Sequence, residues 1–362
     1  MHICFLCVGG FVHIEPYLKY FKKAGHNVSF ITLAPHSDIG IKTYDLSLWG
    51  SYSATEGKWK YPISMLRAYR LIKKIKPDIV HTHYVTSAGL AGVVCGFHPT
   101  ITTVHGSDLN DSIDSKIWKL LLKLVFNHAD CVNTCTKDQK RKVISLGVAP
   151  EKIQVLTLGV DTEIFCFKQR QKLRQGQKIR MVTTRRLEKI YNHVTIIKAL
   201  KILKSKNVYF KMTFVADGAL LEELKELAEL QGVSEKITFL GGVDKSKINS
   251  ILSENDIFIS SPIRDGISVA LLEAMASGLF PVVSEIDTNS DWLTHGVNGF
   301  LHKVNDPESL ANCIMDLYDN DLIVRATQLN REKVVKLADT QTNMKILEGI
   351  YEEMILKAKS KE

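Results

Sequence analysis

One segment decides the fold, SSPIRDGISVALLEAMASGLFPVV, which spans residues 260–283. The residues IFISS at 257–261, which lead into it, predict a strand, and the stretch PIRDG at 262–266 predicts a loop. An apolar run over 268–277 then predicts a helix, which Gly278 stops before the next strand. A strand, a loop, a helix and a second strand in that order are typical of a sheet with parallel strands.

The loop of this segment has the composition of an anion site. Backbone N–H groups of Gly266, Ile267 and Ser268 would face a ligand, with the positive end of the helix dipole behind them, which suits a diphosphate. Glu273 follows in the apolar helix, where an unpaired carboxylate is costly, so we expect it to bind the vicinal hydroxyls of a ribose. The pattern alone leaves an equal alternative, in which Glu273 caps a neighbouring loop and Asp265 is an exposed turn residue.

Strand and helix patterns alternate along the whole chain and restart after a polar, basic stretch at 168–178 that we interpret as a linker. The strands are continuously apolar, which indicates parallel sheets covered on both faces. We therefore predict an α/β fold of two tandem Rossmann-like, doubly wound domains with a ligand site in the cleft between them. The predicted divisions are 1–165, 166–340 and an amphipathic helix at 341–362 that packs back toward the first domain.

The composition is that of a globular protein: 362 residues, 45% apolar and 24% charged. No apolar run reaches the length of a membrane span, and the N-terminus has no basic leader, so it predicts a strand and not a signal peptide. Seven cysteines without a disulfide pattern favour a reducing cytoplasm. The net charge is +8, and residues 1–165 hold 19 Lys and Arg against 13 Asp and Glu, which favours an anionic partner.

The stretch SSPIRDGISVALLEAMASGLFPVVSEI resembles the donor-binding segment of family 4 glycosyltransferases of the GT-B fold, which are retaining enzymes that use a nucleotide-linked sugar. That segment usually has a Glu-Gly-Phe-Gly loop before a Leu-Glu-Ala-Met-Ala helix. The two acids here are Asp265 and Glu273, with the family's spacing of seven residues between them. The resemblance implies that Glu273 binds the ribose, that the backbone of 266–268 binds the diphosphate, and that Asp265 bonds hydroxyls of the transferred sugar. Asp265 is one methylene shorter than the family's glutamate.

Other segments resemble the same family along nearly the whole chain: GVDTEIF (159–165), TTRRLEKIYN (183–192), VADGALLEEL (215–224), ITFLGGVDKSKI (237–248) and DWLTHGVNGFL (291–301). The resemblance implies that Arg186 binds the donor diphosphate, that Asp217 lies in a donor-side turn and that the loop of Val243 contacts the base. The family's lysine would fall at 191 or 192, where this chain has Tyr and Asn, so Lys189 is the candidate to replace it.

In the N-terminal half, VGGFVHIEPYLKYFKKAGHNVSFIT (8–32) and TTVHGSD (102–108) resemble the family's glycine loop and an acceptor-side strand. These matches imply that Gly10 and His105 lie near the donor sugar. A lone histidine with a near-neutral pKa is more often structural. The resemblance gives His105 the task of orienting sugar or acceptor hydroxyls, while the leaving diphosphate takes the acceptor proton. We interpret His13, His81 and His83 as packing or acceptor-side groups.

No G-x-G-x-x-G follows the first strand, which disfavours a nicotinamide cofactor. The family generally needs no metal, and we interpret DND at 319–321 as solvated surface. We therefore expect no cofactor, only a UDP- or GDP-linked sugar as co-substrate. The run 58–76 holds seven basic residues among Trp and Tyr, and it predicts either docking on an anionic membrane or a core helix with a solvated basic face. For 116–126 we favour a core helix with a solvated basic face. Nucleic acid is not expected.

The sequence therefore predicts a retaining glycosyltransferase that extends a saccharide acceptor, lipid-linked, in the synthesis of cell-surface polysaccharide such as lipopolysaccharide. We place it in the cytoplasm, at the inner face of the membrane. Two alternatives stay open: a nucleotide-sugar epimerase of the same fold, which needs no acceptor surface, and a non-catalytic partner subunit. The shortened Asp265 and the missing lysine are the only support for the second alternative.

Overall fold

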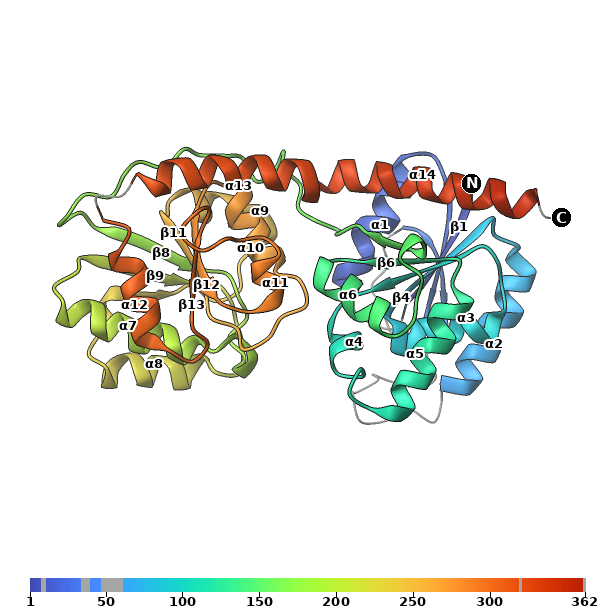
Figure 1. Ribbon diagram of the computed structural model, residues 1–362, viewed down its shortest axis with the longest axis horizontal. Coiled ribbons are helices and arrows are strands. Elements are labelled where there is room, and N and C mark those ends of the chain that lie inside the picture. Colours follow the sequence, from blue (N-terminus) through green and yellow to red (C-terminus); the bar gives the residue numbers. More distant parts are fainter. Residues whose placement is uncertain (8–10, 34–39, 47–60, 319–320, 361–362) are drawn as a thin grey trace. The chain divides into compact units, whose positions relative to one another are not determined.

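The computed structural model describes residues 1–7, 11–33, 40–46, 61–318 and 321–360 (Figure 1). The chain divides into two compact units, Met1–Leu158 with Gln341–Glu362, and Gly159–Thr340. Each unit is a parallel sheet with helices, and every recorded pairing of neighbouring strands within the two sheets is parallel. The predicted fold class, two doubly wound α/β domains, is confirmed.

The sheet of the first unit has the strand order β3-β2-β1-β4-β5-β6-β7. The chain adds strands outward from β1 to β3 on one side and then from β4 to β7 on the other, so the strand order switches between β1 and β4. Its strands are β1 (His2–Cys7), β2 (Asn27–Thr32), β3 (Lys42–Asp45), β4 (Ile79–His83), β5 (Thr100–Val104), β6 (Cys131–Thr134) and β7 (Ile153–Val155). Its helices are α1 (Phe11–Lys23), α2 (Tyr61–Ile75), α3 (Gly89–Cys95), α4 (Ser107–Asn110), α5 (Lys116–His128) and α6 (Lys137–Ser145). Every residue of β4 and β5 is buried, as expected for strands covered on both faces.

The last helix, α14 (Thr340–Lys359), packs on the first unit, although it follows the second unit in sequence. Met344, Leu347, Tyr351 and Ile355 lie on one side of the helix and belong to the same core cluster as Phe5 on β1. Their spacing is that of one helix face. The helix predicted at 341–362 thus completes the first unit's core.

The second unit contains a six-stranded sheet of order β10-β9-β8-β11-β12-β13. The strands are β8 (Ile179–Thr183), β9 (Phe210–Phe214), β10 (Ile237–Phe239), β11 (Ile257–Ser260), β12 (Phe280–Ser284) and β13 (Phe300–His302). The helices are α7 (His193–Ser205), α8 (Leu221–Leu230), α9 (Lys245–Ser253), α10 (Val269–Ala276), α11 (Asp287–Ser290), α12 (Pro307–Met315) and α13 (Leu322–Ala338). Two apolar clusters form the core of this unit.

The units divide after Leu158, earlier than the predicted boundary at residue 165. Residues 159–165 belong to the second unit because Val160 and Phe165 are buried in its core. Gly159 has a φ of +71°, and a Cβ there would collide with the carbonyl group of Ala338 at the end of α13. This turn is therefore built around glycine at one end of the second unit.

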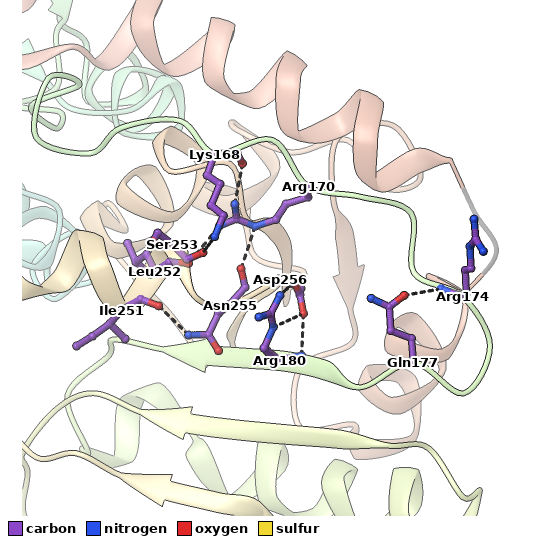
Figure 2. A network of polar contacts seen from close by, with 10 residues as sticks. All are labelled: Lys168, Arg170, Arg174, Gln177, Arg180, Ile251, Leu252, Ser253, Asn255 and Asp256. Carbon is purple, nitrogen blue, oxygen red and sulfur yellow. Dashed lines mark hydrogen bonds and ion pairs between the residues drawn. The ribbon is translucent and has the colours of Figure 1, made fainter.

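The stretch 168–178, predicted as a linker, has little regular structure but is fixed to the second unit (Figure 2). Arg170 is buried, and its guanidinium donates hydrogen bonds to the carbonyl oxygens of Asn255 (2.9 Å), Leu252 (3.2 Å) and Lys168 (2.7 Å). Lys168 Nζ donates to the carbonyl of Ser253 at 2.9 Å. A polar, aperiodic sequence resembles a linker, yet here its cations satisfy the backbone carbonyls where α9 ends.

Candidate functional site

The strand, loop, helix and strand predicted for 260–283 are confirmed as β11, the loop 261–268, α10 and β12. Ser268 caps the helix, because its Oγ accepts a hydrogen bond from the N–H of Leu271 at 3.2 Å. Gly278 ends it with a φ of +80°, in a position where a Cβ would collide with the carbonyl oxygen of Lys168. The loop therefore leaves the carboxyl end of β11, where parallel sheets place their ligands.

The N-terminus of α10 has two backbone donors to spare. The N–H of Gly266 is occupied by Asp265 Oδ1 at 2.9 Å. Within the described part of the chain, the N–H groups of Ile267 and Ser268 have no acceptor. No acidic residue lies in the first turn of α10, so the helix dipole there is not neutralised. This arrangement can bind an anion.

The Asp265 carboxylate is held by an arginine that the sequence analysis did not single out. Arg185 Nη2 lies 2.6 Å from Asp265 Oδ2, and the two side chains are only 9% and 11% exposed. Arg185 also donates to Ser268 Oγ at 3.2 Å and lies over the ring of Tyr191. The sequence TTRRLEKIYN does contain two adjacent arginines, but the sequence of a loop does not reveal which of two neighbouring side chains turns inward.

The two cations predicted to bind phosphate lie at the surface. Arg186 is 73% exposed, and its Nε contacts Glu188 Oε1 at 3.1 Å. Lys189 is exposed in a short 3-10 turn that ends at Tyr191. Asn192, at the other position where the family has lysine, adopts a φ of +48° and directly precedes α7. The structure therefore leaves Arg186 and Lys189 outside the buried network around Asp265.

The loops after β9 and β10 meet at the predicted donor-side residues. Asp217 is exposed, and its carboxylate lies against Gly241 and Gly242, where any added Cβ would crowd it. The carbonyl of Asp217 accepts a hydrogen bond from the N–H of Leu187, which ties this turn to the loop after β8. Val243 packs against the same apolar cluster as Ile267. Asp217 and Val243 are both among the residues that the resemblance assigned to donor binding.

Glu273 has a carboxylate without a partner among the residues that the structure describes. Burial raises the pKa of this carboxyl to about 7, although the charges of Lys245 and Arg185 act in the opposite direction. A desolvated carboxylate with free lone pairs is characteristic of a ligand contact.

Several further polar atoms near the carboxyl ends of β8 and β11 are buried without a hydrogen-bond partner. They are Thr183 Oγ1, Thr184 Oγ1, Arg185 Nε, His193 Nδ1 and Ser260 Oγ. Buried polar groups are nearly always satisfied, so a concentration of orphaned ones is expected where a ligand or ordered water completes the structure. No pattern in the sequence marks these atoms.

The first unit places His105 at the carboxyl end of β5, in a cluster of rings. Its Nε2 lies 3.0 Å from His83 Nδ1, and its ring stacks on Tyr84 with centroids 4.2 Å apart. Burial lowers the pKa of His105 to about 3, so the near-neutral pKa expected from the sequence is wrong and the ring is uncharged. His81 is fully buried, His105 is partly buried, and His13 is exposed with its ring centroid 5.5 Å from that of His105.

The backbone around His105 is unusual. Tyr84 follows β4 with a φ of +72° and begins a π-helical turn, Tyr84–Ala88. Gly106 has a φ of +109°, and Asp108 accepts hydrogen bonds from the N–H groups of His105 and Gly106. Strained backbone and π turns are concentrated at functional sites. The predicted donor residue Gly10 lies outside the described residues.

Within the described ranges, no group of three or more His, Cys, Asp or Glu side chains is arranged to hold a metal ion. Asp319 and Asn320 of the DND motif are outside those ranges. Among the helices of the same ranges, none has both the length and the hydropathy that crossing a bilayer requires.

Two family models match the chain in tandem: Glycosyltransferase Family 4 over residues 9–164 and Glycosyl transferases group 1 over 166–334. UDP-Gal:alpha-D-GlcNAc-diphosphoundecaprenol alpha-1,3-galactosyltransferase of Escherichia coli is 29% identical over 315 residues, covering 81% of this chain and 80% of the relative. The putative glycosyltransferase EpsD of Bacillus subtilis (strain 168) is 26% identical, covering 95% and 94%. Anabaena Alr3699/HepE, solved with UDP and glucose, shares the fold with a TM-score of 0.78 and 16% identity, covering 98% and 100%.

Proposed function

Because the chain belongs to the family 4 glycosyltransferases of the GT-B fold, we propose that it uses a nucleoside-diphosphate sugar and retains the configuration of the transferred sugar. The protein is a glycosyltransferase; the donor and the stereochemistry are the proposal. The observation that carries it is the N-terminus of α10, where the two free N–H groups directly precede the helix and the unpartnered Glu273 lies within it. Diphosphate and ribose present the complementary groups, an anion and a pair of hydroxyls.

In this proposal Glu273 accepts hydrogen bonds from the ribose hydroxyls, and the N–H groups of Ile267 and Ser268 bind the diphosphate. Arg186 and Lys189 are exposed, so their long side chains can turn toward the phosphates, Arg186 by leaving its surface contact with Glu188. These groups stabilise the negative charge that builds on the leaving diphosphate. Asp217 and Val243 form the wall beside the base.

His105 is neutral and can donate one hydrogen bond and accept another, which suits the orientation of sugar or acceptor hydroxyls. The leaving diphosphate takes the acceptor proton, so no charged histidine is needed. The predicted contact between Asp265 and sugar hydroxyls has less support, because Arg185 and the N–H of Gly266 already occupy that carboxylate. No metal or other cofactor has a role in this proposal.

The proposed acceptor is a lipid-linked saccharide in the assembly of a cell-surface polysaccharide, including lipopolysaccharide. The Escherichia coli relative carries a diphosphoundecaprenol acceptor in its name, and that relation supports the assignment. We propose that the enzyme meets this acceptor at the cytoplasmic face of a membrane. The first unit has a surface suited to that position.

That surface is formed by α2 and α5, with α3 between them (Figure 1). Helix α5 exposes Ile117, Leu120 and Leu124 together with Lys116, Lys119 and Lys123, and neither α5 nor α2 contains an acidic residue. Helix α2 exposes Ile63 and Leu66 beside Arg67, Arg70, Lys73 and Lys74. We refer to these exposed residues as the basic apolar face.

Exposed aliphatic side chains among cations fit an anionic bilayer, because the aliphatic groups can insert among lipid tails while the cations contact the anionic headgroups. The reading preferred for 116–126, a core helix with a solvated basic face, does not account for the 73% exposure of Ile117 and the 63% exposure of Leu120. Residues 58–60 of the predicted docking segment lie outside the described residues.

The test is incubation of the protein with a panel of UDP- and GDP-linked sugars, with and without lipid-linked saccharides. We expect one donor to raise the unfolding temperature and to release nucleoside diphosphate slowly, and faster with the right acceptor. Isomerised donor without release would identify an epimerase, and protection without any turnover would identify a non-catalytic subunit. Glu273→Ala should abolish the protection; protection that survives this change would remove Glu273 from the site.

A further inference from the structure

We infer that Arg185 is a positioning residue of the anion site, that it holds the loop 265–268 in its binding shape, and that Asp265 is its anchor and not a ligand of the sugar. The inference rests on the proposed function for the identity of the anion, and it departs from that proposal in the role of Asp265.

Arg185 bridges both ends of the loop. Its Nη2 bonds Asp265 Oδ2 at 2.6 Å, and its Nη1 bonds Ser268 Oγ at 3.2 Å. Each acceptor in turn fixes a backbone amide, since Asp265 Oδ1 accepts from Gly266 and Ser268 Oγ accepts from Leu271. One guanidinium thus determines the path of the backbone between these residues, and that backbone carries the two free N–H groups.

Arg185 is itself fixed. Its Cζ lies 4.1 Å from the centroid of the Tyr191 ring, within the range of a cation–π contact. The loop of Arg185 and Tyr191 is joined to the anion loop a second time, because the N–H of Ile263 donates to the carbonyl of Ile190 at 2.9 Å. The loop after β8 therefore acts as a template for the loop after β11, the neighbouring strand in the sheet.

Charge gives a second reason for the pair. An unpaired Asp265 next to the N-terminus of α10 would repel a diphosphate and would compete for the dipole that should bind it. With Arg185 bonded to it, and with both groups about one-tenth exposed, that carboxylate is neutralised inside the protein. The free N–H groups of Ile267 and Ser268 then remain for the ligand.

The adjacent arginines supply a matched experiment, because Arg185→Gln and Arg186→Gln remove the same charge one residue apart. Affinities are measured by calorimetry for UDP, GDP, uridine and guanosine. We expect R185Q to weaken the nucleoside diphosphate that the wild type prefers by about thirtyfold, and the matching nucleoside by less than about threefold. Arg186 contacts the phosphates in the proposed function, but its guanidinium is exposed and screened by solvent, so R186Q should weaken the diphosphate by less than about tenfold.

Asp265→Asn separates positioning from sugar binding. D265N keeps a hydrogen-bond acceptor for Arg185, so we expect the ratio of the affinities for the nucleotide sugar and the nucleoside diphosphate to stay unchanged. The double variant R185Q/D265N removes the buried unpaired carboxylate and should recover part of the diphosphate affinity that R185Q loses. The unfolding midpoint of each variant shows that the second unit is folded.

If the wild type binds a nucleoside diphosphate and R185Q binds it equally well, the inference about Arg185 is overturned and the proposed function stands. A D265N variant that loses the nucleotide sugar but keeps the nucleoside diphosphate would also overturn it, since Asp265 would then be a sugar ligand. If the wild type binds no nucleoside diphosphate, the proposed function fails and this inference fails with it.

Discussion

The hydroxyl of Tyr351 lies 2.5 Å from Nδ1 of His81, so that the C-terminal helix α14 is bonded to β4, the central strand of the first unit's sheet. Both side chains are fully buried, and His81 Nε2 continues the network to Thr103 Oγ1 at 2.6 Å. Burial lowers the pKa of His81 to about 3, so this is a bond between neutral groups. The helix is held by a polar contact as well as by its apolar face.

Tyr351→Phe should destabilise the first unit by about 1–3 kcal/mol, because it leaves His81 Nδ1 buried without a partner. Tyr351→Ala should cost about 3–5 kcal/mol, since it also opens a cavity. Chemical denaturation measures both. Leu356→Ala, on the exposed side of the same helix, is the control and should change stability little. Equal effects of Y351F and L356A would mean that the bond to His81 contributes nothing.

The raised pKa of Glu273 makes stability depend on pH. The folded protein holds this proton up to a pKa of about 7, while the unfolded chain releases it near 4.5. Stability from this group is therefore fully present below pH 4.5 and falls by up to about 3 kcal/mol as the pH rises through 7. Denaturation across this range should show Glu273→Gln gaining on the wild type with rising pH. Glu285→Gln changes an exposed carboxylate and should follow the wild type.

Arg170→Ala should destabilise the second unit by about 1–3 kcal/mol, because three carbonyl oxygens lose their donor (Figure 2). Arg174→Ala removes an exposed guanidinium from the same stretch and should cost little. Thermal unfolding of both variants decides between a docked segment and a loose linker. Identical melting of R170A and the wild type would contradict the anchoring role.

The basic apolar face predicts two separable contributions to membrane binding. Vesicles of phosphatidylcholine with about 30% phosphatidylglycerol should sediment the wild type, and pure phosphatidylcholine should not. K116Q/K119Q/K123Q should weaken binding about tenfold at low salt, while I117S/L120S/L124S should remove the part that resists high salt. Leu230→Ser, at an exposed leucine of the second unit, is the control. Binding unaffected by the triple serine change would exclude α5 from the contact.

Much of the fold follows from local sequence. The strand, loop and helix of 260–283 could be placed because Ser268 and Gly278 mark both ends of α10 and the strands are short apolar runs. Strands β7 and β13, of three residues each, were not predicted, although β10 of the same length was. β3 was also missed: it is a four-residue edge strand with no buried residue.

The site was harder to predict because its decisive features are not local. Arg185 and Arg186 are neighbours in sequence, and only the position of Asp265, eighty residues away, distinguishes them. The uncharged state of His105 depends on burial among His83, Tyr84 and His13, which come from other elements. Glu273 could be identified because a carboxylate in an apolar helix is anomalous in the sequence itself.

The return of α14 to the first unit has a consequence for biosynthesis. The first unit is interrupted by the whole of Gly159–Thr340, and its core includes Leu347 and Tyr351 from beyond that insertion. During translation the N-terminal residues emerge first, yet their unit is completed last, after every residue of the other unit has been made. The nascent chain therefore exposes the apolar groove for α14 throughout most of its synthesis, and the second unit can reach its final fold before the first.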